Sequence, residues 1–170
     1  MTVEIKRVDT LDAIAQQQLF DWGDDIFGVQ ILNLQWRPKD LHFLLYEDGK
    51  LASHAGILKH IIRVTDEPIV VAGLGGVVTL PEAQRRGFAR LLVQQCMSVM
   101  ESEWKVEAGL LFCLPRMVQY YESLAWQVLE SSVMIEQPRG KIVSPLRVMV
   151  FPLGGMNWPP GTVELQSLPW

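Results

Sequence analysis

The sequence has few cysteines, no excess of basic charge and no long apolar run. Cys96 and Cys113 are the only cysteines in 170 residues, and both lie within apolar segments at a spacing unlike that of metal ligands. We therefore expect two buried thiols in a reduced compartment and neither a disulfide framework nor a metal site. The net charge of −4 and the pI near 5.4 give no electrostatic footprint for nucleic acid.

Targeting signals are also missing from the pattern of residues. Residues 1–9 alternate apolar and charged side chains, unlike a signal peptide or a transit peptide. No apolar run has the length needed to span a bilayer. We expect a cytoplasmic protein with no membrane partner and no nucleic-acid partner.

The order of apolar patterns predicts one domain of the α/β or α+β class. With 170 residues, 49% of them hydrophobic and 20% charged, the chain can bury a core of ordinary size. Asp48-Gly49 between two apolar runs predicts a hairpin turn over residues 47–50. The remaining pattern favours a mixed sheet with helices on its faces. Strands are expected at 3–8, 42–46, 51–62, 69–80, 110–114, 126–129, 133–135 and 146–151, with helices at 10–27, 87–104 and 116–124.

Two of these assignments depend on local signals. The helix at 10–27 takes Asp9 or Thr10 as its N-cap and Gly28 as its stop. The helix at 87–104 carries one apolar stripe, which is typical of a helix packed on a sheet. This stripe consists of Phe88, Leu92, Cys96, Val99 and Met100. Residues 138–145 are expected to form a polar loop.

The most informative segment lies between an apolar strand and this amphipathic helix. A basic turn with Gly87 connects them, so several backbone N–H groups and the positive end of the helix dipole point to one place. Gly87 lets a phosphate approach without a side chain in the way. The sequence therefore predicts a pyrophosphate cradle, although an exposed basic helix start is an alternative. The turn reads Gln84, Arg85, Arg86, Gly87, Phe88 and Ala89.

A second motif follows about thirty residues later. A helix ends on small Ala125 and a strand begins at Trp126, which puts Tyr120 and Tyr121 near the C-terminal edge of the sheet, beside the first motif. One reading is a phenol that takes part in chemistry. The other is a pair of aromatic residues at the edge of the core.

Together the two motifs resemble the GNAT superfamily of acyl-CoA-dependent N-acetyltransferases. The turn at residues 84–89 fits the family's Gln/Arg-x-x-Gly-x-Gly/Ala loop, and Tyr121 to Trp126 is similar to its tyrosine helix and corner, with Ala125 where glycine is usual. The resemblance covers residues 3–151 and implies a GNAT-like domain, 1–153, with a mostly antiparallel sheet. Weaker similarity to the aminoglycoside 2′-N-acetyltransferases is carried by residues 42–46, 51–55 and 148–153 and by the final Trp170.

The resemblance implies a reaction and a set of residues. A neutral amine would attack the thioester of acetyl-CoA directly, with Tyr121 as the acid that protonates the leaving thiolate, and no metal is implied. Strand residues Val77, Val78 and Thr79 would hold the pantetheine. The pyrophosphate would be held by Gln84, Arg85, Arg86, Gly87, Phe88 and Ala89.

The acceptor side differs from that of the aminoglycoside enzymes. Gly75, Gly28 and Asn33 stand where those enzymes would have carboxylates, so a polycationic acceptor would be poorly neutralised. With no acid on the strand, we expect that a water or a backbone carbonyl takes the amine's proton, or that the acceptor enters largely as the neutral amine. The three histidines, His42, His54 and His60, are expected to be structural. Candidate acceptor contacts are Asp24, Asp25, Gly75 and Trp170, although Asp24-Asp25 also fits a solvated acidic pair.

Three functional classes remain open from the sequence. The first is an enzyme that acetylates a small-molecule amine. The second is an acyl-CoA-binding sensor without catalysis, because the position of the base is empty. The third is an interaction module whose tail, residues 154–170, docks on a partner. The two tryptophans of that tail, Trp158 and Trp170, predict that it packs on the domain or against a second subunit of a homodimer.

Overall fold

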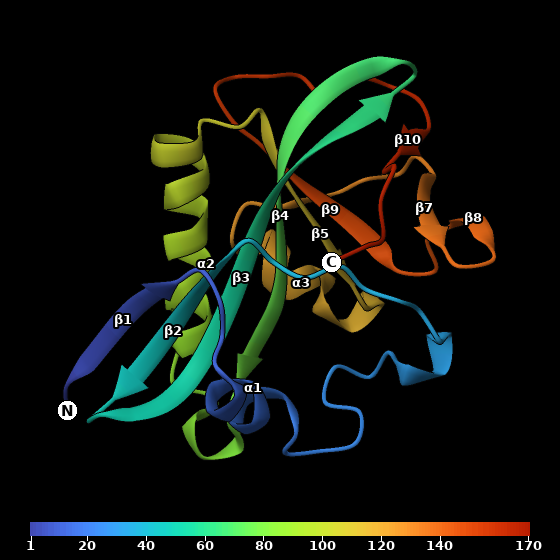
Figure 1. The fold of residues 1–170 in the computed structure, drawn as a ribbon. Helices are drawn as coiled ribbons and strands as arrows, with labels where there is room; N and C mark the ends of the chain where they lie inside the picture. Colours follow the sequence, from blue (N-terminus) through green and yellow to red (C-terminus); the bar gives the residue numbers. More distant parts are fainter.

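The computed structural model describes residues 1–170, and its centre is one mixed sheet of ten strands (Figure 1). Its first part is an antiparallel series in which each strand pairs with the next. Two-residue turns with positive φ join the second strand to the third and the third to the fourth, which confirms the predicted hairpin at residues 47–50. These strands are β1 (Val3–Val8), β2 (Leu41–Glu47), β3 (Lys50–Val64) and β4 (Glu67–Thr79).

The rest of the sheet contains two parallel pairs of strands. β5 (Ala108–Cys113) runs parallel to β4 and antiparallel to β9 (Arg147–Pro152), which also pairs with β6 (Gln127–Val128). At the far end of β3, β10 (Val163–Glu164) lies between β3 and β7 (Val133–Gln137), and it runs parallel to β7. β7 continues into a hairpin with β8 (Gly140–Val143). The predicted fold class, a single domain with a mixed and mostly antiparallel sheet, is confirmed.

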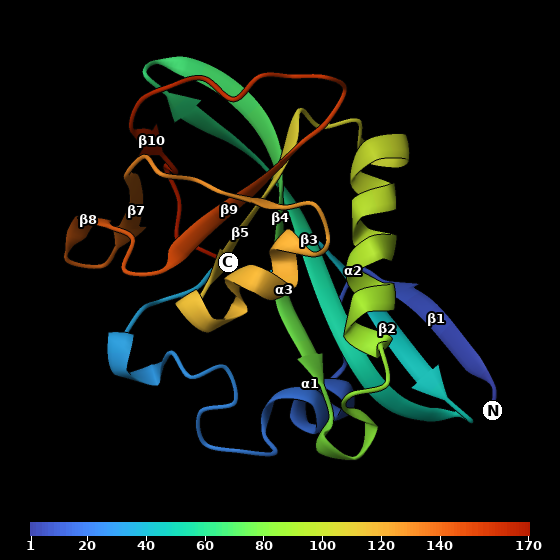
Figure 2. The ribbon, with the colours of Figure 1, turned by 180° about the vertical axis from the view of Figure 1, so that it is seen from behind.

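Helices cover both faces of the sheet (Figures 1 and 2). α2 (Phe88–Val99), its π-helical extension η3 (Met100–Trp104) and α3 (Val118–Glu122) lie on one face, and α1 (Ala13–Phe20) lies on the other. The whole predicted stripe of α2 is buried. Three short 3₁₀ turns complete the structure: η1 (Gln30–Leu32), η2 (Pro81–Ala83) and η4 (Pro115–Met117).

Strand β2 shows why this sheet needs two helical layers. Phe43 and Leu45 are buried in the same cluster as α2, whereas Leu44 is buried with Leu19 of α1. Neighbouring side chains of a strand point to opposite faces, so a strand covered on both sides has a continuous apolar sequence. No helix of the chain combines the length and the apolarity needed to cross a membrane.

The structure corrects two of the predicted elements. The first helix spans only Ala13–Phe20, because Asp12, and not Asp9 or Thr10, is the N-cap: its Oδ1 accepts the Ala15 N–H at 2.7 Å. Residues 21–29 are bends and turns. The predicted polar loop at 138–145 contains β8, whose four residues are all exposed, so no alternation of apolar side chains marked it as a strand.

The C-terminal segment is part of the sheet and its core. Val163, Leu165 and Trp170 are buried in one cluster with residues of β3, β4 and β5. The Trp170 indole lies against Gly73 and its Nε1 donates a hydrogen bond to the Leu110 carbonyl at 3.0 Å. A domain boundary at residue 153 stays a prediction.

Candidate active site

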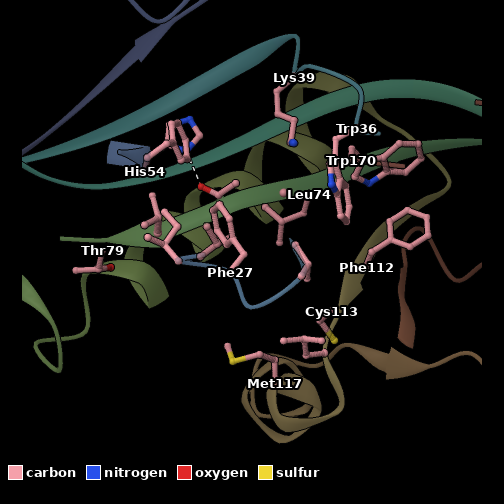
Figure 3. Close-up of a pocket in the computed structure, with 18 of the residues that line it drawn as sticks. Phe27, Trp36, Lys39, His54, Leu74, Thr79, Phe112, Cys113, Met117 and Trp170 are labelled. Carbon is pink, nitrogen blue, oxygen red and sulfur yellow. Dashed lines mark hydrogen bonds between the residues drawn. The ribbon is translucent and has the colours of Figure 1, made fainter. Parts of the chain in front are cut away.

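The parallel strands β4 and β5 are paired along only part of their length. Residues 71–74 pair with residues 108–111, but β4 continues to Thr79 and β5 to Cys113 without further pairing to each other. A cavity of about 570 Å³ opens where the two strands separate (Figure 3). The edge of β4 that faces β5 therefore has no strand partner along residues 75–79, and an extended ligand can lie there.

This cavity brings together residues that are far apart in the sequence. Lys39, Trp36 and Trp170 lie along one part of it, with Cys113 and Met117 across from β4 (Figure 3). No group of three or more His, Cys, Asp or Glu side chains converges as a metal site would require. Among the predicted site residues, those that line the cavity are Gly75, Val77, Val78, Thr79, Gln84, Tyr121 and Trp170.

The turn before α2 presents its backbone to solvent. Gly87 is the N-cap of α2 with a φ of 82°, and no side chain caps the helix. The first bond of the helix runs from Leu91 N–H to the Gly87 carbonyl, so the amides of residues 87–90 have no partner in the protein. A side chain at Gly87 would meet nothing within 4 Å, which leaves room for a ligand. Free amides at the positive end of a helix dipole form an anion site.

The side chains of this turn have separate roles. Arg86 Nη1 donates to Glu47 Oε2 at 2.6 Å, and the guanidinium stacks on the Phe88 ring at 4.9 Å. Phe88 itself is buried in the core. Gln84 Nε2 donates to the Thr79 carbonyl at 3.1 Å, which ties the turn to the end of β4. Arg85 and Ala89 flank Gly87, and Arg85 has a positive φ of 62°.

Tyr121 of α3, the helix that follows β5, also lines the cavity. Its ring packs edge-on to Tyr120 at 5.0 Å and to Trp126 at 6.5 Å between centroids. Burial raises the pKa of Tyr121, so the phenol stays protonated at neutral pH and can serve as a proton donor. Tyr120 is less buried than Tyr121, does not line the cavity, and has a hydroxyl that is enclosed without a partner.

Two histidines expected to be structural form a hydrogen-bonded pair on the cavity wall. His54 Nδ1 donates to the Gly76 carbonyl at 2.6 Å, because a carbonyl can only accept. Burial lowers the pKa of His54 to about 4, so the ring is neutral and its Nε2 is an acceptor. His42 Nδ1 must then donate to that Nε2, at 2.9 Å. In neutral His42 the remaining nitrogen, Nε2, is left with a free lone pair.

Lys39 is a cavity residue that sequence reasoning missed. Its side chain lies across Gly56 and Gly75, which face each other on β3 and β4. A Cβ at Gly56 would lie 2.5 Å from Lys39 Cγ, and a Cβ at Gly75 would lie 2.6 Å from Cε and 3.0 Å from Nζ. Burial lowers the pKa of Lys39 to about 8, so it is still mostly charged at pH 7. Only the three-dimensional pairing of two glycines nineteen positions apart reveals this path.

The acidic pair near α1 lies outside this cavity. Asp24 and Asp25 border a neighbouring cavity of about 440 Å³. Asp25 Oδ1 accepts the N–H groups of Val29 and Gln30 at 3.0 and 3.2 Å, so this carboxylate already holds a local turn. A Cβ at Gly28 would lie 2.9 Å from Arg116 Nη2. The Arg116 guanidinium therefore lies beside a position where the aminoglycoside enzymes would have a carboxylate.

Both cysteines are free and buried. Cys113 lines the cavity, and its Sγ lies 3.8 Å from Met149 Sδ. Burial raises the pKa of the Cys113 thiol to about 11, so almost no thiolate is present at neutral pH. Cys113 is thus an apolar wall residue and not a nucleophile.

The separated strands, the unpaired amides before α2 and the cavity between β4 and β5 are features of an acyl-CoA-dependent transferase fold. A model of the acetyltransferase (GNAT) domain matches residues 35–129, more than half of the chain, and the chain belongs to this family. It is an acetyl-CoA-dependent N-acyltransferase.

Several known proteins are similar to this chain. Nodulation protein A of Rhizobium meliloti (strain 1021) is 25% identical over 132 residues, which cover 71% of this chain and 67% of that protein. The GNAT family N-acetyltransferase (YhbS) of Escherichia coli, solved with CoA, has a TM-score of 0.64 and 15% identity over 96% of this chain and 89% of its own. A GNAT family acetyltransferase of Brucella melitensis, solved with acetyl-CoA, has a TM-score of 0.58 and 15% identity over 95% and 94%.

Proposed function

We propose that this enzyme transfers an acetyl group from acetyl-CoA to a primary amine of a small molecule by direct attack. The observation that carries the proposal is the free edge of β4, which lines one cavity together with Tyr121. An extended pantetheine can pair with residues 75–79, as a strand added to a sheet does. The free amides of residues 87–90 can then hold the pyrophosphate. The two similar structures solved with CoA and acetyl-CoA support this cofactor.

The reaction then needs no covalent enzyme intermediate. The amine nitrogen forms a bond to the thioester carbonyl carbon, the carbon–sulfur bond breaks, and CoA leaves as a thiolate. Tyr121 supplies the proton that makes the leaving group a thiol. Its protonated state at neutral pH and its place on the cavity wall suit this role. The second proton, the one lost by the amine, needs an acceptor.

His42 is the acceptor that we propose for that proton, in place of the water or carbonyl expected from the sequence. The bond from His54 to the Gly76 carbonyl orients both rings and leaves His42 Nε2 with its lone pair free. The Phe20 ring packs edge-on to His54 at 5.4 Å and helps to keep it in place. A base whose tautomer is set in advance needs no rearrangement before proton transfer.

This base predicts a particular pH dependence. Burial and nearby Lys39 lower the pKa of His42 below 6.5, while Asp40 raises it, with the net shift downward. Protonated His42 cannot accept a proton, so kcat/KM should fall as the pH falls through that pKa. The acidic limb of the profile of log(kcat/KM) against pH should lie at the same pH for amines of different pKa. His42→Gln should abolish this limb and lower kcat about tenfold or more.

His60→Gln is the matched control, because His60 Nε2 donates to the Leu165 carbonyl, its Nδ1 accepts from Arg37 Nη1, and the ring does not line the cavity. It should keep the parent profile. A limb that moves with the pKa of each amine would show that the acceptor simply enters as the neutral amine, without His42.

Catalysis itself is tested by following thiol release from acetyl-CoA with a panel of amines. Amine-dependent release supports the enzyme. Stabilisation against melting by acetyl-CoA without any turnover would support a sensor instead. If acetyl-CoA gave neither turnover nor stabilisation, the interaction module would be the remaining alternative. A cytoplasmic location and a homodimer stay predictions. A polycation such as an aminoglycoside is disfavoured as the acceptor, since no Asp or Glu lines the cavity.

A further inference from the structure

Arg90 links the helix that begins at the proposed cofactor turn to the helix that carries Tyr121. It lies in the first turn of α2, and its guanidinium reaches the end of α3 on the same face of the sheet (Figure 2). Arg90 Nη1 donates to Ser123 Oγ at 3.2 Å, and Nη2 donates to the Ser123 carbonyl at 3.3 Å. Arg90 takes part in none of the three salt bridges, so Ser123 is the partner that orients this guanidinium.

Helix α3 depends on such contacts because it is short. It has five residues and no side-chain cap at its start, so its internal hydrogen bonds alone stabilise it little. The last carbonyls of any helix also need partners from outside the regular pattern. The chain just after α3 supplies most of them, whereas the Ser123 carbonyl receives its donor from α2. The local bonds run from the N–H groups of Ser123, Leu124, Ala125 and Trp126 to the carbonyls of Gln119, Tyr121, Glu122 and Tyr121, respectively.

The Ser123 hydroxyl extends the link from Arg90 to the peptide that enters Tyr121. Ser123 Oγ donates to the Tyr120 carbonyl at 2.5 Å, and a hydroxyl oxygen that donates can still accept from Arg90. The Tyr120 carbonyl and the Tyr121 N–H belong to one planar peptide unit. The orientation of that unit, and with it the start of the Tyr121 side chain, is therefore tied to the first turn of α2.

We propose that Arg90 is a positioning residue, which couples an anion at the turn before α2 to the placement of Tyr121. This inference rests on the proposed function, in which the turn holds the pyrophosphate and Tyr121 is the acid. The unpaired amides of residues 87–90 and the Arg90 side chain belong to the same turn of helix. A diphosphate on those amides fixes this turn, and the two bonds to Ser123 carry the constraint to α3. The acid is then held firmly when a thioester is present to receive its proton.

Two substitutions break this link from opposite sides. Ser123→Ala removes the hydroxyl without changing any charge, and Arg90→Met removes both donors. Each should lower kcat about fivefold, and the double variant should lose little more than Arg90→Met alone, because both changes break one link. The acetyl-CoA Kd of Ser123→Ala should stay within about twofold of the parent value. Steady-state thiol release and calorimetry measure these effects.

The protein offers a matched control for each substitution. Ser102 Oγ donates to the Ser98 carbonyl at 2.7 Å, at the end of the other long helical segment, so Ser102→Ala removes the same kind of bond. Arg63 Nη1 donates to the Asp66 carbonyl at 2.9 Å in the turn between β3 and β4, so Arg63→Met removes a comparable donor. Neither residue lines the cavity or contacts α3, and both variants should keep the kcat of the parent.

Fluorine NMR separates positioning from a general loss of stability. The chain has three tyrosines, so labelling with 3-fluorotyrosine gives three signals that Tyr→Phe variants assign. The probe is the nucleotide part of CoA, adenosine 3′-phosphate 5′-diphosphate, which lacks the pantetheine that would touch Tyr121 directly. It should shift the Tyr121 signal in the parent enzyme. In saturated Arg90→Met and Ser123→Ala, we expect less than about half of that shift, and in Ser102→Ala the full shift.

The possible outcomes distinguish the coupling from the proposed function. No shift in the parent, or an equal shift in the parent and both variants, would overturn the coupling. A loss of kcat in Ser123→Ala with the full shift retained would also overturn it, because the defect would then not act through Tyr121. Amine turnover together with either of these results would reject the coupling and keep the enzyme. A shift that depends on Arg90, in a protein that acetylates no amine, would keep the coupling and reject the acetyltransferase proposal.

Discussion

The two ends of the cavity are built in different ways. At the proposed cofactor end, the groups available for binding are backbone groups from one stretch of chain, residues 75–90, which includes Gly87. At the acceptor end they are side chains from distant segments, such as Lys39, Phe112 and Trp170. Backbone amides can bind any phosphate in the same way, whereas side chains must match one molecule.

This difference teaches which part of the protein can vary. A new side chain on the acceptor wall should change which acceptor binds. Cofactor binding should be unaffected by it, because the proposed cofactor contacts are made by main-chain groups. Gly75 belongs to both ends: it is part of the free edge of β4 and it also gives Lys39 its path. Substitutions at each end should therefore have separable effects on cofactor binding, chemistry and acceptor binding.

The largest expected effect is at Tyr121, which lies between the two ends. Tyr121→Phe keeps the ring and its edge-on packing on Trp126 but removes the proton donor. We expect kcat to fall about 10²-fold or more, with acetyl-CoA affinity unchanged, as measured by thiol release and calorimetry.

Tyr120→Phe is the control for this substitution. Tyr120 does not line the cavity and its hydroxyl has no partner to lose, so kcat should stay near that of the parent. Normal turnover by Tyr121→Phe would mean that the thiolate leaves unaided or that the acid is elsewhere. Reversed effects would assign the acid to Tyr120.

A smaller effect is expected at the cofactor end. Gly87→Glu puts a negative side chain into the open space beside the free amides and forces a non-glycine residue to a φ of 82°. The Kd for acetyl-CoA should rise at least tenfold, about 1.4 kcal/mol, in calorimetry.

Gly155→Glu tests whether the backbone strain alone explains that result. Gly155 has a similar φ of 72° and also has nothing within 4 Å of an added Cβ, but it lies outside the cavity. Its acetyl-CoA affinity should match that of the parent. An equal loss of acetyl-CoA affinity in both variants would show that the turn at Gly87 does not bind the cofactor.

The smallest expected effect is at the acceptor wall. Trp170→Phe removes the hydrogen bond to the Leu110 carbonyl and leaves that carbonyl without its side-chain donor, which should cost about 1 kcal/mol of unfolding free energy. The acceptor KM should change while acetyl-CoA affinity does not. Denaturant unfolding and steady-state kinetics measure the two effects.

Trp158→Phe is the comparison for that substitution. Trp158 Nε1 is buried without a partner, so the same change removes no hydrogen bond and should cost less stability. If the two variants lose the same stability, the bond from Trp170 to Leu110 contributes nothing to the fold. An unchanged acceptor KM in Trp170→Phe would remove this residue from the acceptor wall.

The long apolar patterns carried most of the fold prediction. Strand β3, strand β4 and the helix formed by α2 and η3 were predicted within a few residues, because a long β-rich run or a clear helical stripe has few alternatives. The first helix was predicted too long, since Trp22, Ile26 and Phe27 continue the apolar pattern but line the cavities. Strand β8 was missed because all four of its residues are exposed and show no alternation of apolar and polar side chains.

The sequence by itself determined the class of fold, and it supplied the proposed cofactor turn, because both depend on residues close together in the chain: Gly87 before an amphipathic helix, and Tyr121 on the next one. Only the tertiary structure decided the acceptor side. The pairing of Gly56 with Gly75 opened a path for Lys39, and a hydrogen bond to the Gly76 carbonyl turned His54 and His42 into an oriented pair. Such contacts join residues with no fixed spacing, so no local pattern records them.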